Sequence, residues 1–561
     1  MSGRGWKLSI LGLCAAAVAF VQVSATAGRP LAELLPGGAL LLLESPDFGN
    51  LVTRWHGTPE KTLWLESANY QAFSRSKLFF RLKEAQAAFS AVAGLPTDVS
   101  LLDSIAGAES ALAIYDIGEL GFVYLTRLES ARTFETLLWR RRANFESRSA
   151  AGVTYFARDD SESGRSVAFA VIDDLLVVGT SADLVARTIR LTTGENIARL
   201  NDEQWYSAAA PASNGQSPTL RMCYNLAALT RTPHFRSYWI HQNATALRSY
   251  SAGASELYFT PEGLREERAF VKTSPADTPE IAPVDLGRVL AAVPSDSDYF
   301  RLRGPVASQE VAQLFGRKLF QPKIESAARE DSAPAAYASG DSVGSESQLE
   351  TRIDIAPARR SDQGLDLSRL TEILQTAGID AVAEISQARL SPGGVLVRME
   401  NALVVTAQSD WDVASIKAAF SELALARFGA AAPEDEWTQR GNTFALDGVA
   451  PLFVETRGNL LLVSNADALL TAIVRSLDTE APSLLATEIL GFRHGIARVG
   501  YETLMRHLDF INNGYGDDPQ RAPYFFSENV LSLGQALARV EEVRVTRHHA
   551  PGILRETVEY E

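Results

Sequence analysis

The chain has 561 residues, of which 46% are hydrophobic and 22% are charged, a composition typical of globular protein. Its formal net charge is −15, which disfavours nonspecific nucleic-acid binding and overall adhesion to anionic lipid, because both require a basic surface. The length allows two or three domains.

The N-terminus has the pattern of a secretory signal that is removed after export. Arg4 and Lys7 precede an apolar run at residues 8–21, and an Ala-Thr-Ala sequence at 25–27 fits a cleavage site. The apolar run is too short to cross a bilayer comfortably as a helix. We therefore expect residues 1–27 to be a signal peptide. The mature protein would then be periplasmic or secreted and have no transmembrane segment.

The next segments favour a strand followed by helices. A Pro-Gly-Gly turn at 36–38 leads into the apolar run 39–43, which is typical of a strand buried on both faces. Asp47 can cap a following helix that passes through Trp55. Between residues 58 and 93 apolar and aromatic residues recur at helical spacing, which predicts one or two amphipathic helices.

A shorter pattern of strand, turn, strand and helix occurs four times. Its copies lie at residues 110–142, 167–191, 394–425 and 452–477. Ser181 and Asn465 are the expected N-caps of two of the helices, since their side-chain oxygens can accept first-turn amide bonds. Short hairpins followed by helices predict an α+β fold, with mostly antiparallel sheets and helices packed on one face.

Two distant parts of the chain resemble each other, which predicts an internal duplication. The segment 175–189 recurs as 460–474, and a terminal hairpin at 256–266 recurs loosely as 542–556. We expect two homologous α+β halves, at 28–273 and 285–561, joined by a Pro/Ser/Thr-rich linker at 274–284. Within the second half, residues 325–364 are rich in small and polar residues and predict a flexible low-complexity loop.

Several short motifs match catalytic or metal-binding patterns without the context that such sites need. Residues 340–344 read G-x-S-x-G but lack the flanking strand and helix, and residues 74–77 read S-x-x-K without the accompanying motifs. The seven histidines show no zinc-ligand spacing, and residues 512–518 lack the register of a calcium loop. We therefore assign no catalytic, cofactor-binding or metal-binding residue. Whether the chain is an enzyme stays open, and the absence of a complete catalytic set favours a non-enzyme.

Three further features concern binding and reactivity. Arginines and aromatic residues concentrate in one segment, which makes it a candidate interaction patch: Arg231, Phe235, Arg236, Tyr238 and Trp239. Their spacing equally suits a helix that buries its aromatic side chains in the core. Cys223, the one cysteine outside the signal, is expected to be a buried apolar side chain. His548 and His549 are expected in the turn of the terminal hairpin.

The opening Leu35-Pro36, the Leu-rich run ending at Glu44 and the later hairpin–helix units resemble a family of exported bacterial proteins known only as a domain of unknown function. The resemblance implies an extracytoplasmic location and a duplicated α+β organisation, and it carries no catalytic residues; the loop 325–364 departs from it. Our leading hypothesis is a non-catalytic periplasmic protein that binds or scaffolds an unknown protein partner. The alternatives are a secreted hydrolase without a familiar motif and a carrier of an apolar ligand held between sheet and helices.

Overall fold

The structure of the chain is a computed structural model. It describes residues 28–66, 70, 74, 77–94, 101, 104–128, 136–161, 165–209, 217–232, 247–260, 263–274, 281–320, 365–390, 397–428, 437–447, 451–478, 483–493 and 540–561. The predicted signal peptide, most of the predicted linker and the predicted loop 325–364 lie outside these residues. Within them, no helix is long and apolar enough to cross a membrane.

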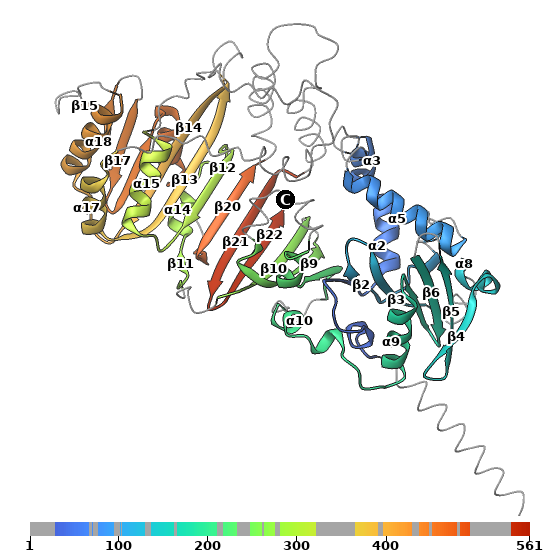
Figure 1. Cartoon of the computed structure of the whole chain (residues 1–561). Helices are drawn as coiled ribbons and strands as arrows, with labels where there is room; N and C mark the ends of the chain where they lie inside the picture. The colour runs from blue at the N-terminus through green and yellow to red at the C-terminus, as the bar shows by residue number, and fades with distance from the viewer. Residues whose placement is uncertain are drawn as a thin grey trace, which may run out of the picture. The chain divides into compact units, whose positions relative to one another are not determined.

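The chain forms two compact units (Figure 1). The N-terminal unit comprises Met1–Ile281 together with Met505–Glu561, and the C-terminal unit comprises Ala282–Leu504. The boundary after Ile281 falls inside the predicted linker. The last hairpin differs from the predicted domain boundaries: its strand β22 (Ile553–Tyr560) pairs with β10 (Leu264–Lys272), so the hairpin belongs to the N-terminal unit.

The sheet of the N-terminal unit is antiparallel throughout. Its strands follow the order β4 (Glu146–Ala150), β5 (Val153–Asp160), β6 (Arg165–Ile172), β7 (Leu175–Gly179), β3 (Gly121–Arg127), β2 (Ser110–Asp116), β1 (Leu41–Ser45), β8 (Leu220–Tyr224), β9 (Tyr250–Phe259), β10, β22 and β21 (Glu542–Ala550). The prediction that strand β1 is buried on both faces is wrong. Leu42 is buried, whereas Leu41 and Leu43, which face the other way, are only half-buried. His548 and His549 lie within β21 rather than in the hairpin turn.

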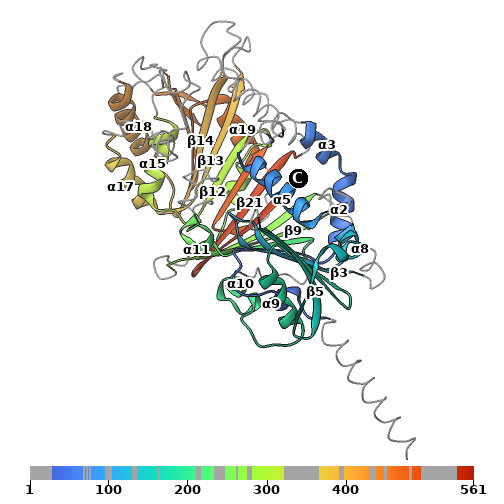
Figure 2. The same cartoon turned by 45° about the vertical axis from the view of Figure 1, so that its right-hand side comes forward.

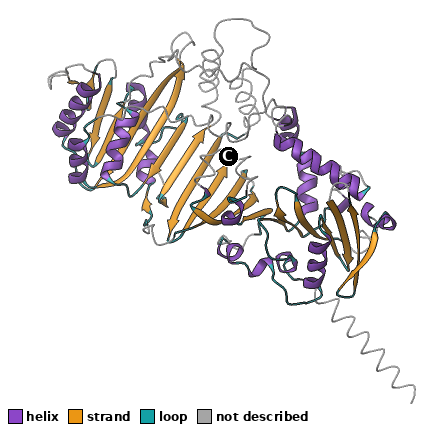
Figure 3. Ribbon diagram, in the orientation of Figure 1, coloured by secondary structure: helices purple, strands orange, loops and turns teal. Residues whose placement is uncertain are grey.

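Helices cover both faces of this sheet, which corrects the prediction of a single covered face (Figure 3). Helix α9 (Ala182–Thr192) packs Val185 and Ile189 against one face of β6 and β7. Helix α5 (Lys77–Ala93) packs Val92 against their other face. Residues 167–172 of β6 and 175–178 of β7 are continuously apolar because alternate side chains enter two different cores.

The other helical segments in the described part of this unit are short. They are η1 (Leu31–Leu34), α2 (Phe48–Gly57), α3 (Pro59–Glu66), α8 (Leu137–Arg140), η2 (Arg142–Asn144), η3 (Leu200–Asp202), α10 (Gln204–Ala208) and α11 (Leu226–Leu229). Two predicted caps are confirmed: Asp47 accepts the amide of Asn50 at 3.1 Å, and Ser181 accepts that of Leu184 at 3.4 Å. The predicted repeat 110–142 has its hairpin, but its helix is only the four residues of α8.

The sheet of the C-terminal unit has the same strand order as the first eight strands above. It runs β15 (Trp437–Arg440), β16 (Thr443–Leu446), β17 (Leu452–Arg457), β18 (Leu460–Ser464), β14 (Val397–Ala407), β13 (Ile379–Leu390), β12 (Tyr299–Arg303) and β20 (Glu488–Arg493), all antiparallel. In both sheets, the strand that precedes the helix of the second repeat pairs with the second strand of the earlier hairpin. In the N-terminal unit β7 pairs with β3, and in the C-terminal unit β18 pairs with β14. Strands β11 (Val284–Asp285) and β19 (Leu485–Ala486) form a separate pair.

Helices cover both faces of this sheet as well. Helices α15 (Ser308–Lys318), α17 (Ser368–Ala377) and α18 (Val413–Phe428) share one core, and α14 (Gly287–Ala291) and α19 (Asp467–Ser476) share the other. Figure 2 shows α15, α17 and α18 gathered together in this unit.

Two predictions for the C-terminal unit are wrong in detail. The hairpin of the predicted repeat 394–425 begins at β13, because Val397–Ala407 is one continuous strand paired with Ile379–Leu390. The N-cap of α19 is Ala466 and not Asn465. The Asn465 side chain instead accepts the amide of Asn401 at 2.8 Å, which ties the end of β18 to β14.

Candidate functional site

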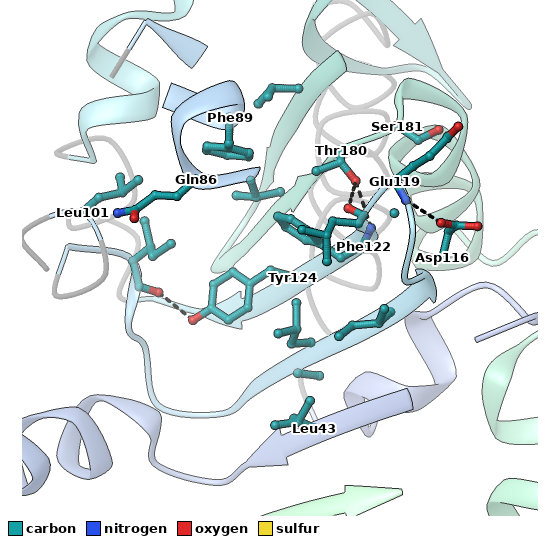
Figure 4. Close-up of a pocket in the computed structure, with 18 of the residues that line it drawn as sticks. Leu43, Gln86, Phe89, Leu101, Asp116, Glu119, Phe122, Tyr124, Thr180 and Ser181 are labelled. Atoms are coloured by element: carbon teal, nitrogen blue, oxygen red, sulfur yellow. Dashed lines mark hydrogen bonds between the residues drawn. The ribbon is translucent and has the colours of Figure 1, made fainter. Parts of the chain in front are cut away.

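The N-terminal unit contains a cavity of about 950 Å³ between its sheet and α5 (Figure 4). One wall is the face of β1, β2, β3, β6 and β7 that lies opposite α9, and the other wall is α5 with parts of α2 and α8. The apolar side chains that line it include Leu43, Phe48, Phe89, Val92, Leu101, Ile105, Leu112, Ile114, Phe122, Leu138, Val167 and Val178.

Aromatic rings from the helices meet aromatic rings from β3 across the cavity. Phe89 of α5 stacks on Phe122, with ring centroids 6.1 Å apart and planes at 24°. Phe48 of α2 meets Tyr124 edge-on at 6.3 Å. Phe122 and Tyr124 reach the same cavity because they are two residues apart in a strand and therefore share a face.

The floor of the cavity has its polar atoms paired within the protein. The Tyr124 hydroxyl donates to the carbonyl of Ile105 at 2.9 Å, and the Ser110 and Thr126 hydroxyls lie 2.7 Å apart. The amide of Gly107 donates to Thr126 Oγ1 at 3.1 Å. A Cβ at Gly107 would collide with the Arg127 carbonyl, so glycine permits the close approach that holds this segment under Tyr124.

A second group of polar residues gathers at the other end of the cavity, at the β2–β3 turn and the end of β7 (Figure 4, right). Thr180 Oγ1 donates to the Leu120 carbonyl at 3.0 Å and accepts the Phe122 amide at 2.9 Å. Asp116 accepts the amide of Glu119 at 2.7 Å, and both of these acidic residues are exposed. These bonds shape the turn and make this the polar end of the site.

The hydroxyl groups that line the cavity are hydrogen-bonded within the protein. Six hydroxyl-bearing residues line the cavity, and each makes a hydrogen bond within the protein: Ser45, Ser110, Tyr124, Ser166, Thr180 and Ser181. The lining residues include no histidine, lysine or cysteine. The lining also carries the carboxylates of Glu44, Asp116 and Glu119.

A buried ionic network surrounds Glu44 of β1, a residue that also lines the cavity. Glu44 accepts the Tyr206 hydroxyl at 3.2 Å and lies 3.9 Å from Arg221, and burial raises the pKa of its carboxyl. Arg221 is paired at 2.5 Å with Glu256, which is fully buried and also accepts a hydrogen bond from Tyr258 at 2.7 Å. Each of these charged or hydroxyl groups is paired with another member of the network, so we interpret the network as structural.

Cys223 lies beside this network, is 2% exposed and forms no disulfide. Burial raises the pKa of its thiol to about 12, so the thiol is protonated at neutral pH and unreactive. The prediction that it is a buried apolar side chain is confirmed. Among the described residues, no three His, Cys, Asp or Glu side chains cluster as metal ligands.

The corresponding layer of the C-terminal unit, between its sheet and α15, α17 and α18, is filled by aromatic rings. Phe420 of α18 packs against Phe315 at 5.4 Å and against Phe320 at 5.7 Å between ring centroids. All three side chains are fully buried. Among the described residues, the two units therefore share a strand order and differ in this layer, which holds a cavity in one unit and packed aromatic rings in the other.

The structure tests little of the predicted interaction patch. Arg231 is exposed and its amide donates to the Ala228 carbonyl at 3.2 Å, just after α11. Phe235, Arg236, Tyr238 and Trp239 lie outside the described residues, as do the motifs at 340–344 and 512–518. The cavity residues were missed at the sequence level because an apolar side chain beside a cavity has the same pattern as one in a packed core.

No family model and no curated protein matches the chain. Among solved structures, it is similar to crystal form I of TP0453, with 14% identity and a TM-score of 0.26, and to crystal form III, with 11% identity and a TM-score of 0.24. Each match covers 44% of this chain and 80% of the other.

Proposed function

We propose that this is an exported, non-catalytic binding protein whose N-terminal unit holds an apolar ligand with an acyl-chain-like body. The cavity between α5 and the sheet carries this proposal. Its volume of about 950 Å³ lies within the range of small-molecule sites, and its lining is mainly aliphatic and aromatic, with the exposed carboxylates Asp116 and Glu119 near Thr180. An elongated ligand would place its apolar part against Phe89 and Phe122 and its polar part near Thr180.

The apolar lining favours an apolar ligand over water. Each methylene of a ligand that moves from water into contact with these aliphatic and aromatic side chains contributes about 0.8 kcal/mol, whereas ordered water in such a site needs two to four polar partners.

Two further parts of the proposal concern the origin and location of the chain. The shared strand order of the two sheets supports an ancestral duplication, after which one copy kept an open layer and the other filled it. The signal-like sequence at 1–27 and the resemblance of the opening segment to exported proteins support a periplasmic or secreted location.

The test measures binding of a fluorescent fatty acid to the wild type and to two variants of α5. Ala88 lines the cavity, so Ala88→Trp would place an indole in the ligand's space. If that indole displaces about three methylenes, at about 0.8 kcal/mol each, affinity should fall roughly fiftyfold. Ala91→Trp is the matched control, because Ala91 is on the same helix and is exposed.

The proposal predicts that the wild type and Ala91→Trp bind alike and that Ala88→Trp binds weakly. Absence of binding by the wild type, or equal affinity of the two variants, would contradict it.

A further inference from the structure

Three large hydrophobic side chains are exposed on α2, α3 and α5, and α2 and α5 also line the cavity. Trp55 of α2 is 49% exposed, Leu65 of α3 is 44% exposed and Phe80 of α5 is 57% exposed. They account for three of the seven exposed large hydrophobic side chains among the described residues, within a short stretch of sequence. Figures 1 and 2 both show α2, α3 and α5 close together in the N-terminal unit.

Helix α5 carries aromatic side chains on two opposite sides. Phe89 points into the cavity and stacks on Phe122. Phe80 is nine residues earlier, which at 3.6 residues per turn places it on the opposite side of the helix. Lys83, three residues after Phe80, is exposed beside it, as is Glu84. The outer side of α5 therefore combines an exposed aromatic ring with a cation.

The charge of this stretch is opposite to that of the rest of the chain. Between residues 48 and 93 the sequence carries six basic residues (Arg54, Lys61, Arg75, Lys77, Arg81 and Lys83) against three acidic ones (Glu60, Glu66 and Glu84). The rest of the chain has 53 − 6 = 47 basic and 68 − 3 = 65 acidic residues. A local basic excess in an acidic protein selects a partner with negative charge.

We propose that the outer surface of α2, α3 and α5 docks onto a phospholipid bilayer that contains anionic lipid. Helices with Trp, Phe and Leu on one side and Lys or Arg nearby bind the headgroup region of bilayers in this way, with the rings in the acyl boundary and the cations near the phosphates. The inference goes beyond ligand binding, since docking through Trp55, Leu65 and Phe80 does not require an occupied cavity. It also places the cavity cover at a source of acyl chains.

The test is sedimentation of the chain from residue 28 onward with phosphatidylcholine vesicles, prepared with and without phosphatidylglycerol. We expect binding that requires phosphatidylglycerol and weakens with salt. The double variant Trp55→Ser, Phe80→Ser should lower the partition coefficient by about tenfold or more, because two anchors no longer enter the bilayer. Leu485→Ser is the matched control, since Leu485 is 59% exposed but belongs to the C-terminal unit.

Three results would overturn the inference. The first is a wild-type chain that stays in the supernatant with both vesicle types. The second is an equal loss of binding in the Leu485→Ser control. The third is self-association that disappears in the double variant while no vesicle binding is seen, which would assign the surface to a second copy. Fatty-acid binding in solution is measured separately, so a failure of docking leaves the ligand proposal intact.

Discussion

The substitution Phe420→Ala tests the contrast between the packed and the open layer. Phe420 is fully buried and contacts the rings of Phe315 and Phe320. A buried Phe removes about 150–250 Å² from water, worth roughly 4–6 kcal/mol at 25 cal/mol per Å², and measured Phe→Ala costs are about 3–5 kcal/mol. We expect a loss of about 4 kcal/mol. Phe89→Ala removes a partly exposed ring beside a space that is already open, so it should cost less, about 2–3 kcal/mol.

Hydrogen exchange measured by mass spectrometry can follow the two units separately, because peptides from α18 and from β3 report opening of different units. A loss of about 4 kcal/mol corresponds to roughly a thousandfold faster exchange in the most protected amides of α18. Phe89→Ala should accelerate exchange near β3 by no more than about a hundredfold and leave α18 unchanged. Equal effects of the two substitutions, each in its own unit, would refute the view that one layer is packed and the other open.

Two further predictions concern buried ionisable groups. Burial raises the pKa of Glu44, so its contribution to stability is full below the ordinary carboxyl pKa and is lost as pH rises through the raised value. Glu44→Gln should therefore raise the melting temperature at neutral pH and have a shrinking effect toward acid, and a variant that is less stable at neutral pH would contradict this. Cys223 should not react with maleimide at neutral pH in the folded chain from residue 28 onward, because burial raises its pKa to about 12, and should react fully in denaturant. Rapid labelling of the folded chain would show that the thiol is accessible.

Local features were the most predictable from the sequence. Asp47 and Ser181 were identified as helix caps because an N-cap depends on a side chain and an amide three residues away. Asn465 has the same residue chemistry but serves a cross-strand bond to Asn401, which no local pattern distinguishes. The predicted antiparallel α+β class is shown, since every described strand pair of both sheets is antiparallel.

It was harder to predict which faces of the sheets are covered by helices and where a cavity lies. The apolar runs of β6 and β18 do not alternate with polar residues, and this pattern indicates strands that are buried on both faces. The prediction of helices on one face only did not take this pattern into account. The cavity had no sequence signal at all. Leu112 and Val178 beside the cavity and Leu403 and Val405 in the packed core are the same residue types in the same strand pattern. The open and the packed layer differ in how much side-chain volume the facing helices contribute.

Native mass spectrometry of the protein released gently from its own cells tests the central claim most directly. The account predicts additional peaks at the masses of bound lipids, identifiable by fragmentation, and their loss in Ala88→Trp but not in Ala91→Trp. A wild-type spectrum with only the mass of the polypeptide, under conditions that preserve a known lipid-binding protein, would contradict it.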